Sequence, residues 1–139
     1  MRKRVLTSAI SFILICSLFT SLALAATLRA SKYISSYNAV IYSSGNEITV
    51  DCSITGTGRM KTIGIKSVKI YTSSGTNVAT YSYTTDGYEY LMGSNTGRKT
   101  ASVSYTGVSG RSYYAVVTFY ASDGSGSDSR THTTKTITL

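Results

Sequence analysis

The feature that most constrains the fold is an alternation of apolar and polar side chains with a period of two residues. It is clearest in a run whose apolar members are Ile48, Val50, Cys52 and Ile54 and whose polar members are Thr49, Asp51, Ser53 and Thr55. Successive side chains of a β-strand point to opposite faces of its sheet, so the run predicts a strand with one face on a core. From residue 26 onward no window shows a sustained period of 3.6 residues, the pattern of an amphipathic helix.

Strand-like stretches of this kind recur at short intervals along the chain. They are 37–43, 46–55, 65–72, 77–84, 100–106, 112–121 and 130–138. Turn signals rich in glycine, asparagine and aspartate separate them, including Gly56-Thr57-Gly58. We therefore predict an all-β fold, a single antiparallel β-sandwich of about seven strands, in one domain over residues 37–139. The segment 85–99 is the least strand-like, and we expect it to cross between sheets with Leu91 and Met92 at the core edge.

The first 25 residues have the pattern of a secretory signal peptide. Three basic residues at positions 2–4 precede a run of apolar and small residues, which ends in Ala23-Leu24-Ala25. Signal peptidase requires small residues at this point. We therefore predict a signal helix over residues 1–25, cleavage between Ala25 and Ala26, a leader over residues 26–36, and a secreted protein that is not held in a membrane after cleavage.

Two alternatives to a cleaved signal have less support. A membrane anchor is disfavoured because six hydroxyl residues dilute the apolar run, and a lipoprotein is disfavoured because Ile15, rather than a small residue, precedes Cys16. Removing residues 1–25 lowers the net charge from +8 to +5 and leaves one cysteine, Cys52. The processed chain then has no internal disulfide, so it depends on packing and backbone pairing for stability.

The second half of the chain resembles a fibronectin type III or related immunoglobulin-like sandwich. The resemblance rests on three features of the sequence. They are the inward residues Ala101, Val103 and Tyr105, the link Gly107-Val108-Ser109-Gly110, and the alternating run from Tyr113 to Ala121. The resemblance implies that the Tyr113 hydroxyl bonds to backbone just upstream, as in a tyrosine corner, and that Val108 plugs the preceding turn. The first half departs from the pattern, because the chain has no tryptophan and no proline.

The chain after the signal also resembles an uncharacterised family of small secreted proteins of Gram-positive bacteria. The similarity rests on YISSYNA (33–39), IKSVKIYTSSG (65–75), LMGSN (91–95), SVSYTGVSGRSYYAVVTFYA (102–121) and DSRTHTT (128–134). This resemblance implies secretion and a β-domain, and it implies no reaction.

Catalytic and metal-binding chemistry has little support in the sequence. The single histidine, His132, has no marked nucleophile or carboxylate partner, and we interpret it as a solvated strand residue. Cys52 lies in the apolar phase of its strand, and we interpret it as a buried structural residue, with an intermolecular disulfide as the alternative. The run 123–128 has two aspartates and is better explained as a hairpin than as a calcium loop. We therefore expect no enzyme, cofactor or metal.

A tyrosine-rich sheet face is the strongest candidate for binding. If 65–72 pairs with 112–121, then Tyr114 and Tyr120 share a solvent face with Tyr71 and Lys69, and with Tyr81 or Tyr83 from the next strand. Such a face suits glycans or proteins, and the positive charge favours an anionic cell-surface polymer. The alternative is that tyrosine is present only because it favours strands. Nucleic acid is disfavoured by export, and we expect a monomer.

Two functions follow from this pattern. The first is a secreted, non-enzymatic binding or adhesion module that engages cell-wall, glycan or protein partners through the tyrosine-rich face. The second is a small secreted antibacterial or toxin-like effector, which would also be basic and would also lack catalytic groups.

Overall fold

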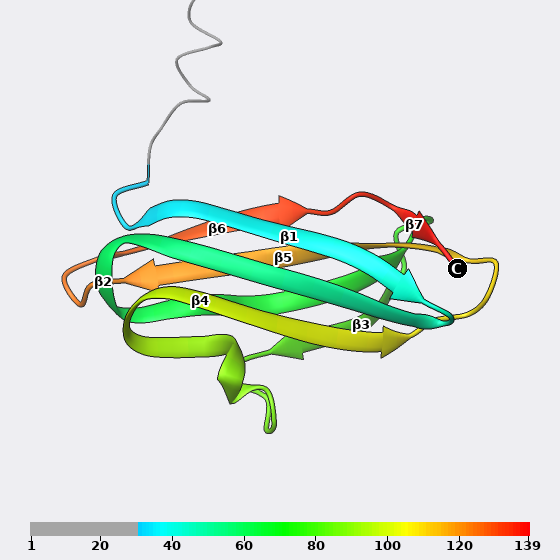
Figure 1. The fold of residues 1–139 in the computed structure, drawn as a ribbon, viewed down its shortest axis with the longest axis horizontal. Helices are drawn as coiled ribbons and strands as arrows, with labels where there is room; N and C mark the ends of the chain where they lie inside the picture. Colours follow the sequence, from blue (N-terminus) through cyan, green and yellow to red (C-terminus); the bar gives the residue numbers. More distant parts are fainter. Residues whose placement is uncertain (1–30) are drawn as a thin grey trace, which may run out of the picture. The chain divides into compact units, whose positions relative to one another are not determined.

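The computed structural model describes residues 31–139 (Figure 1), so the predicted signal peptide, its cleavage site at Ala25–Ala26 and the start of the leader lie outside the described residues. The described part is all-β and antiparallel. Its elements are β1 (Ile34–Ser44), β2 (Glu47–Thr72), β3 (Asn77–Ser82), the 3-10 turn η1 (Glu89–Leu91), β4 (Met92–Thr106), β5 (Ser112–Ser122), β6 (Ser127–Thr133) and β7 (Ile137–Thr138). This part of the chain contains no helix of the length and apolar character needed to span a bilayer.

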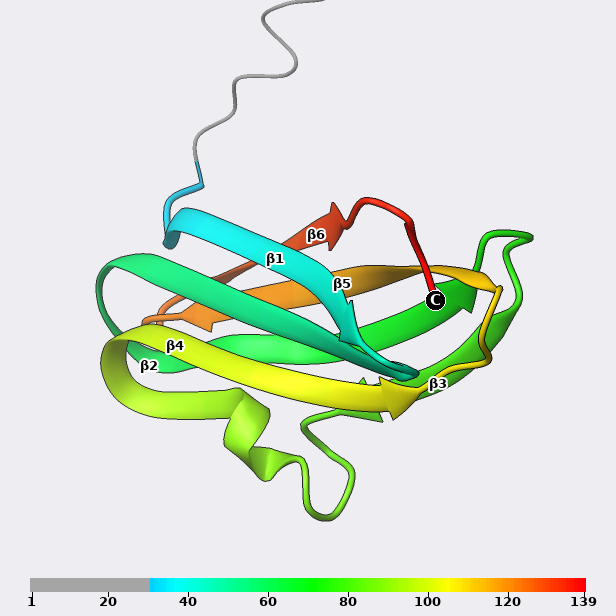
Figure 2. The same ribbon diagram turned by 45° about the vertical axis from the view of Figure 1, so that its right-hand side comes forward.

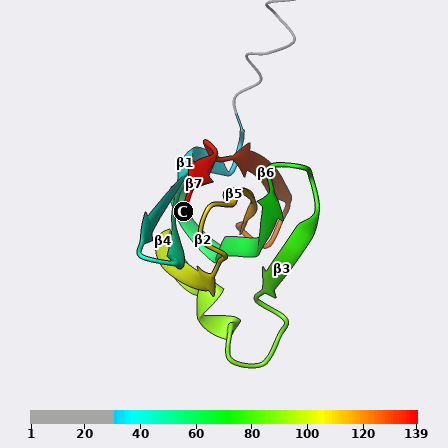
Figure 3. The same ribbon diagram turned by 90° about the vertical axis from the view of Figure 1, so that its right-hand side faces the viewer.

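Strand β2 organises the whole domain, because it has 26 residues and takes part in two layers. Its first half pairs with β1 on one side and β4 on the other, whereas its second half pairs with β3 and β5. β6 and β7 continue the second layer by pairing with β5. The result is one sheet that curls into two facing layers, consistent with a sandwich (Figures 2 and 3).

The stretches 46–55 and 65–72, predicted as two strands, are parts of one bent strand, β2. Gly56-Thr57-Gly58 is not a turn, because the strand runs through it. The pairing with β4 is interrupted between Thr55 and Met60, and the pairing with β1 shifts register at Gly56 and ends there. A side chain at Gly56 would meet the Gly58 carbonyl and the Met60 side chain. The glycine therefore allows a sharp bend in a continuous strand, where the composition alone suggested a reversal.

Three further boundaries differ from the prediction. The stretch 130–138 is two strands, β6 and β7, and β1 begins at Ile34, inside the predicted leader. The segment 85–99 is only partly irregular, because β4 starts at Met92 and follows β2 around its bend. Leu91 is fully buried, as expected, and Met92 is half-buried.

The core lies between the layers and follows the alternation in the sequence. In the first layer Cys52 lies between Ala39 and Ala101 in register. In the second layer the inward residues of β5 are all buried; they are Tyr113, Ala115, Val117, Phe119 and Ala121. Ala101 and Tyr105 of β4 are inward but only half-buried, which places β4 near the rim of the core.

Tyr113 makes the bond that the resemblance to a tyrosine corner implies. Its side chain is buried, and its hydroxyl oxygen accepts a hydrogen bond from the backbone N–H of Val108 at 2.9 Å. The expected plug at Val108 is wrong, because 53% of that residue is exposed. The Val108 backbone, rather than its side chain, ties the turn to the core.

We predict that Tyr113→Phe lowers the free energy of unfolding by about 1–2 kcal/mol, because the Val108 N–H loses its partner in a partly buried position. Tyr105→Phe is the matched control, since the Tyr105 ring packs on Tyr113 with centroids 6.0 Å apart and no bond from its hydroxyl is observed. Urea denaturation measures both values. Equal losses of unfolding free energy in the two variants would show that the Tyr113–Val108 hydrogen bond does not stabilise the domain.

Gly64 is a second backbone constraint, at the point where β2 passes the 3-10 turn. A side chain at this position would overlap the Leu91 carbonyl and the backbone of Met92. Just beyond it, the β2–β5 register shifts between Ile65 and Ser67, so Lys66 occupies a β-bulge. Close packing at Gly64 thus fixes η1 against β2. The bulge shifts the alternation by one residue, so that Ile63 and Ile65 point inward before it and Val68 and Ile70 point inward after it.

We expect Gly64→Ala to destabilise the domain by about 2 kcal/mol or more, because the added methyl group meets backbone atoms that cannot rotate away. Gly58→Ala is the control in the same strand, since its added methyl group would meet no atom within 4 Å. Thermal unfolding of the two variants tests this. A Gly64→Ala domain as stable as Gly58→Ala would show that η1 moves freely.

Candidate functional site

The structure brings together most of the residues predicted for the binding face. β2 and β5 pair so that Lys69 lies opposite Val116 and Tyr71 lies opposite Tyr114. These residues belong to the phase opposite to the buried Val68 and Ile70, so they lie on the outer face of the second layer. We call the set Lys66, Lys69, Tyr71, Tyr114 and Tyr120 the Tyr-Lys face.

Tyr71 and Tyr114 form a parallel ring stack at one end of the Tyr-Lys face. Their ring centroids are 5.4 Å apart and the ring planes differ by 12°. Each ring therefore covers one face of the other, so the pair offers less open ring surface than two separate rings would. Such cross-strand aromatic pairs stabilise sheets. The pair is thus a rigid ridge of phenol edges beside the exposed ammonium of Lys69.

Tyr120 lies at the other end of the Tyr-Lys face, in a hollow of about 330 Å³ that is lined by Thr62, Lys66, Tyr83 and Tyr120. The bulge turns Lys66 toward this hollow, where its ammonium lies over the Tyr120 ring, 5.9 Å from the centroid. Tyr120 lies six positions after Tyr114 in β5, which corresponds to ~20 Å along an extended strand. The hollow and the ridge are therefore the two ends of one elongated surface.

Tyr83 joins this surface, but Tyr81 does not. Either tyrosine was expected near the face; Tyr83 lines the hollow, whereas Tyr81 is opposite the buried Val68 and so lies in the inward phase. Its hydroxyl donates to the Ser104 carbonyl of β4 at 2.7 Å, and the Tyr90 hydroxyl donates to the Ser102 carbonyl at 2.8 Å. Burial, together with neighbouring phenols, raises the pKa of both tyrosines, so both remain donors well into alkaline pH.

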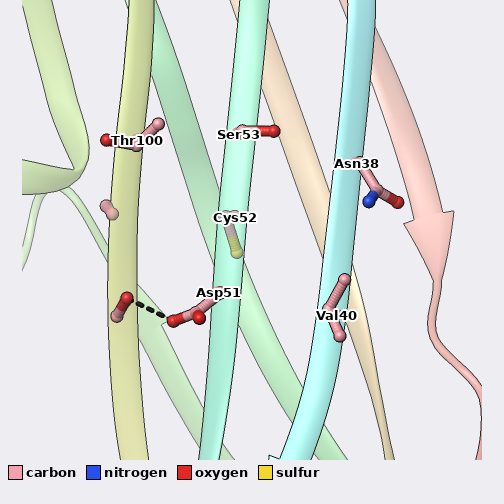
Figure 4. A pocket seen from close by; sticks show the side chains of 8 residues that line it. Asn38, Val40, Asp51, Cys52, Ser53 and Thr100 are labelled. Atoms are coloured by element: carbon pink, nitrogen blue, oxygen red, sulfur yellow. Dashed lines mark hydrogen bonds between the residues drawn. The ribbon is translucent and has the colours of Figure 1, made fainter.

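A second hollow, which the sequence did not indicate, lies on the outer face of the first layer (Figure 4). It measures about 500 Å³ and crosses β1, β2 and β4; its lining residues are Asn38, Val40, Asp51, Cys52, Ser53, Thr100, Ala101 and Ser102. The Ser102 hydroxyl donates to the Asp51 carboxylate. Hydrogen bonding to the same carboxylate, then burial, and then the charge of Asp51 raise the pKa of Tyr42. Asp51 is the only charged side chain among these lining residues.

His132 takes a different position from the solvated one expected. It is opposite Val117 in register, so it lies in the inward phase of β6, half-buried. The ring of Tyr37 approaches it edge-on, with centroids 6.4 Å apart. Arg130 and Asp128 share this phase and form an ion pair at 2.8 Å. These residues close the rim between β1 and β6, and His132 has no nucleophile placed against it by any observed bond.

The hairpin between β5 and β6 has the geometry of a turn. Asp123 Oδ1 accepts hydrogen bonds from the Ser125 backbone N–H and hydroxyl, and from the Gly126 N–H. The bonds from Ser125 are the main reason that the pKa of the Asp123 carboxyl is lowered. Within residues 31–139 no three His, Cys, Asp or Glu side chains lie close enough together to hold a metal ion.

Cys52 is buried in the core side of β2, where only 4% of it is exposed. Burial, and then the nearby Asp51 charge, raises the pKa of its thiol to about 12. The thiolate is the reactive form of cysteine, so this position suppresses oxidation and alkylation. The placement supports the structural interpretation of Cys52 over the intermolecular disulfide.

We predict that the chain from Ala26 onward reacts with a thiol-specific reagent such as iodoacetamide at pH 8 at least about a hundredfold more slowly when folded than when unfolded in urea. The reason is that both access and ionisation of the thiol are lost on folding. Mass spectrometry of timed samples measures the rates. Fast stoichiometric labelling of the folded chain would contradict the burial of Cys52.

The hollow beside Tyr120 could not be predicted from local sequence patterns. It depends on the bulge at Lys66 and on the approach of β3 to β2, both of which are long-range results of folding. Comparison of the chain with protein-family models, with curated proteins and with solved structures gave no match.

Proposed function

We propose that this chain is a secreted, non-enzymatic module that binds an anionic polymer outside the cell along the Tyr-Lys face. The observation that carries the proposal is the hollow in which the Lys66 ammonium, the Tyr83 and Tyr120 side chains and Thr62 converge. An ammonium and hydroxyl donors are the groups that recognise a carboxylate or phosphate. The aromatic rings add contact area at small entropic cost.

Charge supports an anionic ligand. Lys66 and Lys69 are exposed, and the ion pair observed in residues 31–139 joins Asp128 and Arg130 instead. An unneutralised lysine attracts anions over a distance of about one Debye length, ~8 Å at physiological salt. The two lysines lie three positions apart in β2, ~10 Å along the strand, so they can contact successive charges of the same polymer.

The shape of the face supports an extended ligand. The ridge of Tyr71 and Tyr114 and the hollow at Tyr120 are separated by ~20 Å along β5, with Lys69 between them. A monosaccharide would reach one of these positions. A chain of several repeating units would contact all of them and would gain from simultaneous binding at each.

The hollow of the first layer is a weaker candidate for the same ligand. Its one charged side chain is the Asp51 carboxylate, which would repel an anion. The two hollows therefore differ in charge, and only the hollow of the Tyr-Lys face matches the net positive charge of the chain.

Binding to poly-glycerol-phosphate, measured by isothermal titration with the chain from Ala26 onward, tests the proposal. We expect Lys66→Gln combined with Lys69→Gln to weaken binding by up to about fivefold for each lysine, because each removes one charge contact. The salt dependence of the remaining affinity should also become shallower.

The matched control combines Arg59→Gln with Arg98→Gln, which removes the same charge from exposed positions near the bend of β2, where Arg98 is opposite Thr55 and Arg59 donates to the Asn95 carbonyl. We expect it to retain most of the affinity, and we expect neutral dextran to bind neither variant nor the parent chain. Equal loss in both double variants would mean that net charge alone is responsible, and the assignment of the face would then be wrong.

A further inference from the structure

The free edge of β1 differs from the other sheet edges of the domain. An edge strand presents unpaired N–H and C=O groups that can pair with another chain, and natural proteins usually block it. In the described part of the chain, β1 pairs with β2 only. The strand has eleven residues, ISSYNAVIYSS, with no charged residue, no proline and no glycine. Its only irregularity lies at the start, between Ile34 and Ser36.

The edges of β4, β6 and β3 each have a feature that opposes pairing with another chain. The carbonyl groups of Ser102 and Ser104 on the edge of β4 are occupied by the hydroxyls of Tyr90 and Tyr81. β6 carries the inward ion pair of Asp128 and Arg130. β3 has six residues and an irregular register beside Tyr71. Short strands, inward charges and irregular pairing are all known to prevent edge-to-edge association.

Solvent exposure along β1 is also greater than a closed edge would show. Eight of its eleven residues are exposed. Val40 and Tyr42, on its outer face, are each 46% exposed, and Tyr37, on its inner face, is 37% exposed. The regular stretch Ser36–Ser44 is ~30 Å long, and half of its backbone groups point away from β2, as in any edge strand.

We propose that β1 pairs with β1 of a second copy of this chain, antiparallel and about a two-fold axis centred on Val40. A two-fold interface requires a surface that is complementary to itself. In this register Val40 faces Val40, Asn38 faces Tyr42, and Ser36 faces Ser44 across the outer face. On the inner face Ala39 faces Ile41 and Tyr37 faces Ser43.

The absence of charge on β1 is what favours a second copy as the partner. Two identical strands bring identical charges together, and like charges placed opposite each other destabilise a sheet. The chain is basic overall, but β1 adds nothing to that charge. Identical copies can thus approach through this edge without repulsion between the paired strands.

The size of the contact predicts a weak dimer. One strand pair supplies on the order of eight backbone hydrogen bonds over Ser36–Ser44. The surface that it buries lies below the ~1,200 Å² typical of stable complexes. We therefore expect a concentration-dependent dimer with a dissociation constant of about 10 μM to 1 mM. This differs from the monomer that the sequence suggests.

Sedimentation equilibrium of the chain from Ala26 onward, which contains every core residue of the described part, tests the proposal. We expect the parent chain to dimerise and Val40→Lys to weaken the dimer at least about tenfold, because two lysines then face each other at the axis. Val108→Lys is the matched control, since Val108 is 53% exposed and lies in a loop far from β1 in sequence. It should dimerise like the parent chain.

Val40→Cys tests the register. Cys52 is buried with a pKa of about 12, so the new thiol is the only readily oxidised one in the folded chain from Ala26 onward. We expect mild oxidation to give a covalent dimer with Val40→Cys much faster than with Val108→Cys. A parent chain that stays monomeric at about 1 mM overturns the proposal, even if a strand of another protein binds the edge. Equal weakening by both lysine variants, or equal crosslinking by both cysteine variants, also overturns it.

Discussion

The pairing of one long strand with four others is the interaction on which the rest of this structure depends. β2 supplies the centre of the first layer with its first half and a central strand of the second layer with its second half. In most sandwiches a loop joins the two layers, and the layers can then shift relative to each other. Here backbone hydrogen bonds continue around the bend, and β4 follows the same path. The relative placement of the two outer faces is therefore set by the sheet itself, which explains how the domain can do without an internal disulfide.

The irregular points of β2 determine the chemistry of its surface. The bulge at Lys66 directs an ammonium toward Tyr120, and the close contact at Gly64 holds η1 and the following start of β4 in place. Without the bulge, Lys66 would pair with Thr118 on the outer face, and Val68 and Ile70 would leave the inward phase. Bulges are common next to binding sites because they redirect a side chain without ending the sheet. The candidate site thus depends on a local departure from the same alternation that builds the core.

Much of the fold could be predicted from the sequence, because burial imposes a period of two on each strand. The inward residues of β5 were predicted for this reason, and so was the outer face that Tyr71 shares with Tyr114 once their strands pair. The hydroxyl bond of Tyr113 was implied instead by the resemblance to a tyrosine corner. The bend was missed because Gly56 and Gly58 have the composition of a turn, and only the partner strand distinguishes a bend from a reversal. The inward placement of Tyr81 and His132 was missed because a polar tip on an aromatic ring fits both faces of a sheet equally well in the sequence. The rings of these two residues pack at the rims of the core, while their polar atoms reach water or a backbone carbonyl.

The bonds from Tyr81 and Tyr90 to the edge of β4 have a consequence for the size of any assembly. β1 and β4 are the two outer strands of the same three-stranded layer, on either side of β2. If both edges were open, each added copy would expose a new edge, and growth would continue into a fibre. Two carbonyl groups of β4 are occupied by phenol hydroxyls, so this edge is less able to accept a further strand. In a pair of copies joined through the proposed β1 contact, Tyr81 and Tyr90 would therefore oppose growth of the layer beyond two molecules.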